Sequence, residues 1–306
     1  MMIRGGCLEE VAPHTIVELE SATEPHRITR KISVKFCVFL WLKKRTTIEC
    51  GATLEEVEPC IWKSRRGSVR MSIESRYYDG TYLAENPDWD RKDAVWKAAK
   101  VTSILSDNGI EPASICEVGC GSGDVLAHLQ KAMPSTNFTG FDISPQAAQF
   151  WKEHNVGERL RFQLGDFHQT NRITYDVLLM LDVFEHVRDP FSFLENTRRH
   201  ATHFIFHVPL DLSASTVVRG NPLIDARKKV GHLHYYTKDL ALATLCDTGY
   251  EVLDWRYTGA SLNSPNRSLK TRFSALPRRL AYAVDKDFGV RLLGGETLLV
   301  LAKPLS

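Results

Sequence analysis

A glycine-rich segment from Ile115 to Asp124 carries the residues whose spacing is best suited to chemistry. It reads Ile-Cys-Glu-Val-Gly-Cys-Gly-Ser-Gly-Asp, follows an apolar strand-like run and precedes a helical pattern. The glycines Gly119, Gly121 and Gly123 permit positive φ and let the backbone approach a ligand closely, as nucleotide-binding loops do. A glycine loop alone is equally compatible with a simple turn between a strand and a helix. The acids around it therefore decide whether it is a ligand-binding loop.

Carboxylates near the ends of neighbouring strands favour a ligand over a simple turn. Asp142 lies 23 positions after Gly119, close to the offset of about 20 residues expected for an acid that accepts from both ribose hydroxyls. The dinucleotide pattern requires a third glycine where this sequence has Asp124, and a carboxylate there disfavours a pyrophosphate and hence a nicotinamide oxidoreductase. These acids, with Glu117 and Asp166, suit an adenosine-type cofactor that carries positive charge.

From Tyr77 to Lys303 the sequence resembles the class I S-adenosylmethionine-dependent methyltransferases, and within them the type 11/12, ubiquinone-biosynthesis-like subgroup. The resemblance implies that the glycine loop wraps the methionine part of S-adenosylmethionine, that the acid after the second strand binds the ribose, and that Gly165-Asp166-Phe167 holds the adenine. The segment Leu181–Pro190 resembles the family's fourth motif. The cofactor-binding residues implied in this way are Glu117, Gly119, Cys120, Gly121, Gly123, Asp142, Ile143, Asp166, Phe167 and Asp182.

Three histidines are candidate general bases for methyl transfer to oxygen or nitrogen. The sulfonium is already activated, so the protein mainly aligns the acceptor and excludes water, but an acceptor of high pKa must also lose a proton. His186 follows the strand that ends at Leu181, at the sheet edge where the methyl group is expected. His232 and His234 point the same way if their segment is extended. For each histidine the alternative to a general base is a structural role as a hydrogen-bond partner. No metal is expected, because no third ligand stands at a recognisable spacing.

Strand-like and helical runs alternate along the chain and must position these residues. The expected strands are Ser114–Val118, Asn137–Phe141, Leu160–Leu164, Tyr175–Leu181, His203–Val208, Glu251–Tyr257 and Thr297–Ala302. The expected helices are Ala94–Leu105, Asp124–Ala132, Pro145–His154, Pro190–Arg199 and Lys238–Thr248. Repeated strand–helix units predict a mostly parallel sheet. Together with the family resemblance, this gives an α/β fold: a Rossmann-like, doubly wound seven-stranded sheet with the last strand antiparallel and helices on both faces.

The composition separates the first 70 residues from the rest of the 306-residue chain. They contain no Asp, Asn, Gln or Tyr, yet hold four of the seven cysteines, Cys7, Cys37, Cys50 and Cys60. We expect residues 1–70 to be an extension, poorly ordered or arising from an upstream start, with Met71 as the natural first residue; a small binding module is the alternative. Residues 71–306 form the expected methyltransferase domain, with a lid and helix (71–110), a cofactor-binding half (111–209), acceptor-side insertions (210–296) and a final strand (297–303).

The chain as a whole is nearly neutral. Its 39 basic and 37 acidic residues leave a net charge of +2, and its 43% hydrophobic content is that of an ordinary globular protein. An odd number of cysteines without a Cys-x-x-Cys pair predicts a reducing compartment rather than a disulfide scaffold or a zinc finger. The longest apolar run, Phe36–Leu42, is too short to cross a bilayer. A cytoplasmic location is therefore expected.

Aromatic and basic segments outside the motifs bear on the acceptor. Tyr77, Tyr78 and Tyr82 are expected either to form a lid over the cofactor or to pack against the domain. From residue 257 to 284 there are five bases and no acid, and Leu276–Val290 is amphipathic. A run of bases is explained by a face exposed to solvent. The functional alternatives are that these bases bind an anionic acceptor, lipid- or sugar-linked, or that residues 257–284 make a peripheral membrane contact. Nucleic acid is not expected, because no basic platform interleaved with aromatic residues is present.

These observations predict an S-adenosylmethionine-dependent methyltransferase that acts on an oxygen or nitrogen atom of a small-molecule acceptor. The alternative is a non-catalytic relative that binds the cofactor as a ligand. The sequence names neither the acceptor nor the oligomeric state.

Overall fold

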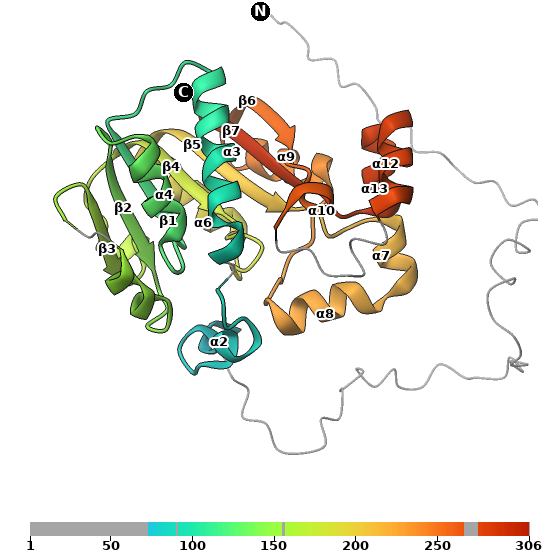
Figure 1. Cartoon of the computed structure of the whole chain (residues 1–306), viewed down its shortest axis with the longest axis horizontal. Coiled ribbons are helices and arrows are strands. Elements are labelled where there is room, and N and C mark those ends of the chain that lie inside the picture. The colour runs from blue at the N-terminus through green and yellow to red at the C-terminus, as the bar shows by residue number, and fades with distance from the viewer. Residues whose placement is uncertain (1–72, 90, 155–156, 266–274, 306) are drawn as a thin grey trace, which may run out of the picture. The chain divides into compact units, whose positions relative to one another are not determined.

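A seven-stranded sheet lies at the centre of the domain (Figure 1). The computed structural model describes residues 73–89, 91–154, 157–265 and 275–305. The strand order is β3–β2–β1–β4–β5–β7–β6; β7 runs antiparallel to β5 and β6, and the other pairs are parallel. The strands are β1 (Ser114–Val118), β2 (Asn137–Asp142), β3 (Leu160–Leu164), β4 (Tyr175–Leu181), β5 (Ala201–Pro209), β6 (Tyr250–Tyr257) and β7 (Thr297–Pro304). The predicted fold class is confirmed.

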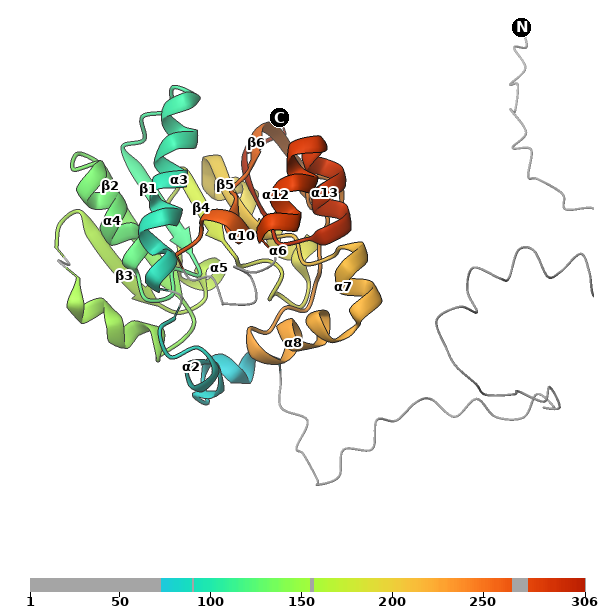
Figure 2. The same ribbon diagram turned by 45° about the vertical axis from the view of Figure 1, so that its right-hand side comes forward.

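Helices cover both faces of this sheet (Figures 1 and 2). The α-helices are α2 (Thr81–Glu85), α3 (Ala94–Asp107), α4 (Asp124–Ala132), α5 (Phe167–Thr170), α6 (Pro190–Thr197), α7 (Ala214–Arg219), α8 (Asn221–Lys229), α9 (Lys238–Asp247), α10 (Ala260–Asn263), α12 (Ala275–Val284) and α13 (Lys286–Leu293). Short 3₁₀ turns are η2 (Ile73–Tyr77), η3 (Arg91–Asp93), η4 (Ala147–Glu153) and η5 (Arg198–His200).

The alternation of side chains along each strand divides the core into two layers. In β4, Leu178 and Met180 face one buried cluster, whereas Val177 and Leu179 face the other. The first cluster is closed by α6, α9 and α13, and the second by α3 and α4. Because both faces are apolar, β4 is a nearly continuous hydrophobic run, as expected for a central parallel strand.

One expectation about local structure needs correction. The helix predicted over Pro145–His154 is the 3₁₀ segment η4. Its position is fixed by tertiary bonds: Trp151 Nε1 donates to the Gly121 carbonyl at 2.9 Å, and His154 Nε2 lies 2.7 Å from the Ser122 carbonyl oxygen. The insertion after β5 folds into α7 and α8.

Several predictions fall on residues outside the described part of the chain. They concern the extension 1–70 with its apolar run and cysteines, the start at Met71, and three of the five late bases, Arg267, Lys270 and Arg272. The three described cysteines, Cys116, Cys120 and Cys246, are free. No helix within the described ranges combines the length and apolarity needed to span a bilayer.

Candidate functional site

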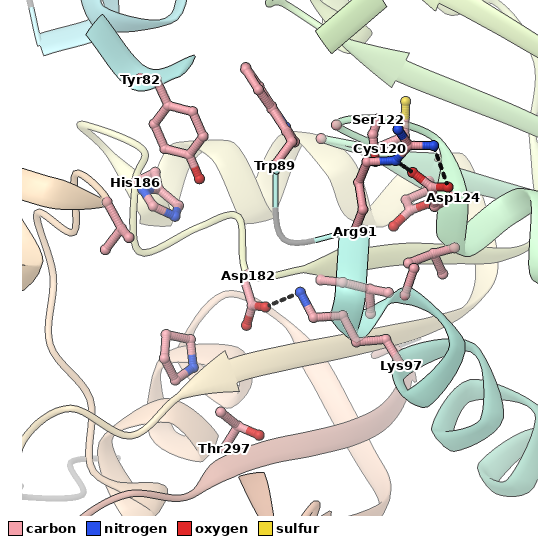
Figure 3. Close-up of a pocket in the computed structure, with 18 of the residues that line it drawn as sticks. Tyr82, Trp89, Arg91, Lys97, Cys120, Ser122, Asp124, Asp182, His186 and Thr297 are labelled. Carbon is pink, nitrogen blue, oxygen red and sulfur yellow. Dashed lines mark hydrogen bonds and ion pairs between the residues drawn. The ribbon is translucent and has the colours of Figure 1, made fainter. Parts of the chain in front are cut away.

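A cavity of about 260 Å³ opens at the carboxyl ends of β1 and β4 (Figure 3). The glycine loop forms one side of it, and the segment after β4 forms another. Aromatic side chains from the segment before α3 lie over its mouth. Its lining includes Tyr82, Trp89, Arg91, Lys97, Glu117, Gly119, Cys120, Gly121, Ser122, Asp124, Asp182, His186, His232 and Thr297. Ligands of open α/β sheets bind at this edge, where the strand order reverses between neighbouring strands.

The glycine loop has a backbone that requires glycine. Gly119, Gly121 and Gly123 have φ angles of 74°, 53° and 81°, which side chains with a Cβ rarely adopt. The loop is held by the Gly119 and Cys120 amides, which donate to the Phe141 carbonyl at 2.8 and 3.0 Å. The loop therefore presents backbone to the cavity, as the sequence predicts, although Gly123 itself is not among the lining residues.

Asp142 joins the end of β2 to the glycine loop. One carboxylate oxygen accepts from the Gly121 amide at 2.8 Å, and the other accepts from the Ser144 amide at 2.8 Å. Burial raises the pKa of Asp142, and these amide donors oppose the rise. Asp142 thus fixes the loop, and it lies beside the cavity rather than among its lining residues.

Glu117 is a buried carboxylate with unused hydrogen-bonding capacity. Only 2% of the residue is exposed, and its Oε2 accepts no hydrogen bond from the described residues. Burial raises its pKa to about 8, while the nearby Lys97 opposes this shift. A buried acceptor without a donor is costly, so a ligand that brings a cationic N–H donor to this side of the cavity fits Glu117 well.

Asp182 occupies a strained position at the end of β4. Its φ of 58° lies in the left-handed region, which non-glycine residues seldom enter. Its carboxylate lies 2.7 Å from Lys97 Nζ and 2.7 Å from His207 Nδ1. Burial alone would raise the pKa of Asp182, but His207 and Lys97 hold it well below the usual range. The carboxylate is thus paired with a lysine of α3 and a histidine of β5, and Figure 3 shows its pair with Lys97.

Asp124 is neutralised by an arginine. Arg91 donates to both of its carboxylate oxygens, at 2.8 and 3.3 Å, and also bonds Glu153 at 2.7 Å. Of the acids that suggest a cationic ligand, Asp124 is therefore already paired within the protein. Glu117 is the acid at the cavity that keeps an oxygen without a hydrogen bond from the described residues.

The three candidate bases have different surroundings. His186 and His232 both line the cavity, with ring centroids 4.8 Å apart. The Nδ1 atom of His232 lies 2.5 Å from Asp211 Oδ2, and the Nδ1 atom of His186 lies 3.1 Å from the Tyr77 hydroxyl. His234 turns away, with its Nε2 2.9 Å from the Val187 carbonyl oxygen. The condition under which His232 and His234 would point the same way, an extended segment, is not met, because the segment is not a strand.

A second buried acid lies beneath these histidines. Glu185 is fully buried, and neither of its carboxylate oxygens has a hydrogen-bond partner among the described residues. Burial raises its pKa well above the usual value. One ligand atom from each of Glu185, His186 and His232 lies within 4.8 Å of the others, close enough to hold a cation. The expectation of no metal is thus left untested.

The predicted adenine side lies outside the cavity lining. Asp166 caps α5 by accepting from the His168 and Gln169 amides. Phe167 is 3% exposed and packs edge-on against Phe141 in the core, so its side chain is not available to a ligand. Ile143 is half-buried. Their contacts with a cofactor stay predictions.

Sequence reasoning did not single out several residues that shape the cavity. Lys97 sits in the first turns of a helix that was predicted only as packing, and Arg91 and Trp89 precede it. Asp211 lies at the start of an insertion. None of these belongs to a motif, and only the fold brings them to the glycine loop and the histidines.

Comparisons with known proteins agree with this geometry. Residues 116–203 match the family "methyltransferase domain". A ubiquinone biosynthesis O-methyltransferase of Colwellia psychrerythraea is 31% identical over 103 residues, which are 32% of this chain and 41% of that protein. Norajmaline N-methyltransferase of Rauvolfia serpentina is 26% identical over 111 residues, 34% of this chain and 38% of that protein. The chain spans about two fifths of the length of these relatives.

Solved structures share the fold at low identity. A methyltransferase in complex with the Trm112 activator of Haloferax volcanii superposes with a TM-score of 0.52 and 17% identity, covering 78% of this chain and all of that one. The plantazolicin methyltransferase BpumL, solved with a substrate analogue and SAH, superposes with a TM-score of 0.52 and 18% identity. The match covers 76% of this chain and 94% of that one. The family match over residues 116–203 and the sequence relatives support a class I S-adenosylmethionine-dependent methyltransferase, and the solved structures share its fold.

Proposed function

We propose that this protein transfers a methyl group from S-adenosylmethionine to an oxygen or nitrogen atom of a small-molecule acceptor. The observation that carries the proposal is the single cavity that joins the glycine loop and Glu117 to His186 and His232. When bound, the cofactor supplies a methyl group activated by its sulfonium. The unsatisfied Oε2 of Glu117 would accept from the cofactor's ammonium, and Asp142 would bind its ribose hydroxyls.

Of the candidate bases, His232 is best arranged to take a proton from the acceptor. Asp211 faces its Nδ1, so the Nδ1 atom carries the hydrogen and Nε2 is left as the acceptor. Burial lowers the pKa of His186 to about 3, which makes it a weak base. Burial also raises the pKa of Tyr77, so its hydroxyl stays protonated and donates to His186. We therefore assign His186 to shaping the cavity and leave His234 outside the reaction.

The nature of the acceptor is the narrower part of the proposal. The curated relatives act, by their names, on oxygen in ubiquinone biosynthesis and on nitrogen in norajmaline methylation, which supports either acceptor atom. The basic segments offer an anionic, lipid- or sugar-linked acceptor as the functional alternative to a solvated face. The cavity's own cations, Arg91 and Lys97, are both paired with carboxylates, so they offer that expectation little support.

Calorimetry with S-adenosylhomocysteine tests the cofactor site. We expect the parent protein to bind it, Asp142→Ala to bind at least about tenfold more weakly, and Asp166→Ala to lose less affinity, because Asp142 holds the Gly121 amide of the glycine loop whereas Asp166 caps α5. No binding by the parent protein would contradict the proposal.

A methyl-donor assay against a panel of hydroxylated and amine metabolites tests the activity. We expect transfer by the parent protein and a loss of about 10²-fold or more in kcat for His232→Ala, with S-adenosylhomocysteine binding unchanged. Binding without transfer to any metabolite would favour the alternative, a non-catalytic cofactor-binding protein. Transfer that a chelator abolishes would assign the Glu185, His186 and His232 group to a cation instead of a proton.

A further inference from the structure

The helices α12 and α13 expose large apolar side chains at a spacing of four residues. On α12, Leu276, Leu280 and Val284 are 66%, 64% and 90% exposed, and on α13, Phe288 and Leu292 are 62% and 42% exposed. Residues four apart lie on one side of a helix, so each helix carries an apolar stripe. Such a stripe normally faces the core, but here it faces outward, at the periphery of the domain (Figures 1 and 2).

The opposite side of each helix is anchored to the domain. Tyr282 and Arg278 both donate to the Gly294 carbonyl, at 2.8 and 3.1 Å. Gly289 brings the two helices together, since a Cβ there would lie 2.7 Å from the Tyr282 ring. Val290 is 4% exposed and belongs to the core. The inner side of the two helices is therefore held to the domain by hydrogen bonds and packing, and the exposed stripe is an additional apolar face.

Basic side chains are interspersed with this face. Arg279 is exposed on α12, and Arg291 is 59% exposed in a surface pair with Asp239. Lys286, at the start of α13, is 42% exposed, and its Nζ lies 3.8 Å from the buried Glu296 and 5.0 Å from the centre of the Tyr257 ring. α12 contains no acid. Of the acids on the adjoining turn, Asp285 caps α13 and Asp287 bonds Lys238 and Tyr257. The face thus combines apolar side chains with an excess of positive charge.

We propose that the outer face of α12 and α13 docks on an anionic lipid bilayer. Exposed leucine, valine and phenylalanine side chains can enter the boundary between headgroups and acyl chains while neighbouring arginine and lysine side chains meet lipid phosphates. A second copy fits less well, because a two-fold contact would bring each set of cations against the same set on the other copy. This inference is independent of the reaction proposed above.

Vesicle sedimentation of the full-length protein tests the proposal. The vesicles are phosphatidylcholine alone, or phosphatidylcholine and phosphatidylglycerol in equal amounts. We expect binding to the mixed vesicles, weaker binding to neutral ones, and a drop of about tenfold or more for Leu280→Glu/Val284→Glu. The matched control Val95→Glu/Ile173→Glu adds the same charge at apolar positions that are 59% and 58% exposed on other elements, and it should bind as the parent does.

A charge variant keeps the test decisive if the apolar variant does not fold. Arg279→Glu/Arg291→Glu changes two exposed side chains, leaves every apolar side chain in place and should also lose binding to mixed vesicles. Equal binding by the parent and either folded variant would overturn the proposal, as would no binding by the parent. Sedimentation equilibrium without lipid completes the test: a dimer of the parent that Leu280→Glu/Val284→Glu dissociates would overturn the lipid assignment in favour of a second copy.

Discussion

The protonation of Glu117 gives the site its clearest pH dependence. Its pKa is about 8 in the folded protein and about 4.3 in an unfolded chain. Between these values the folded state holds a proton that the unfolded state has released. The stabilisation is therefore fully present below about pH 4 and is lost as the pH rises through about 8.

Glu117→Gln removes this titration. We expect the free energy of unfolding of the parent, relative to the variant, to fall between about pH 5 and about pH 8 by roughly a few kcal/mol. Urea denaturation across that range measures it. The control is Glu111→Gln, an exposed position, whose difference from the parent should stay flat. A flat difference for Glu117→Gln as well would show that Glu117 is ionised in the folded protein throughout.

The residues of the site differ in how far the sequence could predict them. The glycine loop and the acids beside it were predictable, because glycine at positive φ and a carboxylate at a strand end are local requirements. Lys97 and Asp211 were not predictable, because each acts on a partner distant in the chain, Asp182 and His232. The side-chain direction of His234 was not predictable for a related reason. Two backbone amides of its segment donate to the Glu185 carbonyl and hold the segment out of strand geometry.

Among the elements, the buried strands and the helices packed on them were the easiest to predict. β1, β3, β4 and α4 have the expected bounds, since their apolar patterns are set by the core they face. The 3₁₀ segment η4 differs, because Trp151 and His154 reach back to the glycine loop and fix its conformation. The stripe on α12 shows the limit of periodicity: it predicts an amphipathic helix but not that its apolar side faces outward.

The close approach of β2 to α4 depends on Gly140. Its backbone is not in the left-handed region, but a Cβ there would lie 2.7 Å from Phe162, 2.8 Å from Cys120 Sγ and 3.0 Å from Leu126. We expect Gly140→Ala to lower the free energy of unfolding by about 1–3 kcal/mol through overpacking, as measured by urea denaturation. Gly157→Ala, where a Cβ would meet nothing within 4 Å, is the matched control. Equal stability of the two variants would contradict this packing.

We propose that the segment before α3 acts as the predicted lid. Trp89 lies against the glycine loop, where a Cβ on Gly121 would be 2.6 Å from the indole Nε1, and Tyr82 packs on Trp89 with ring centroids 4.8 Å apart. A ligand that contacts the loop must therefore change the surroundings of this indole. We expect S-adenosylhomocysteine to alter the tryptophan fluorescence and Trp89→Phe to remove most of that change.

Trp255→Phe is the control for this measurement, since Trp255 lies on β6 and is 38% exposed. It should retain the fluorescence response to the ligand. A response that survives Trp89→Phe and is lost in Trp255→Phe would exclude the lid.

At the scale of the whole molecule, the site lies where the two core layers meet the edge of the sheet. The strands that carry the glycine loop and Asp182, β1 and β4, are neighbours and contribute to both buried clusters. The insertions supply His232 and the outward apolar face of α12 and α13. The scaffold was predictable because its pattern repeats along the chain, whereas the insertions follow no repeat and their placement depends on contacts distant in sequence.

Within the part of the chain that the structure describes, the residues of both buried clusters lie between Ala98 and Ala302, which bears on the predicted boundary at Met71. We expect a chain that begins at Met71 to keep the melting temperature and the S-adenosylhomocysteine affinity of the full-length protein. A chain that begins at Asp93, the N-cap of α3, should still fold but bind at least about tenfold more weakly. It lacks Tyr82, Trp89 and Arg91, which line the cavity. Thermal unfolding and calorimetry on the three chains separate these effects. Loss of folding on removal of residues 1–70 would show that the methyltransferase domain begins before Met71. Equal affinity of the two shortened chains for S-adenosylhomocysteine would show that the segment before α3 does not contribute to the cofactor site.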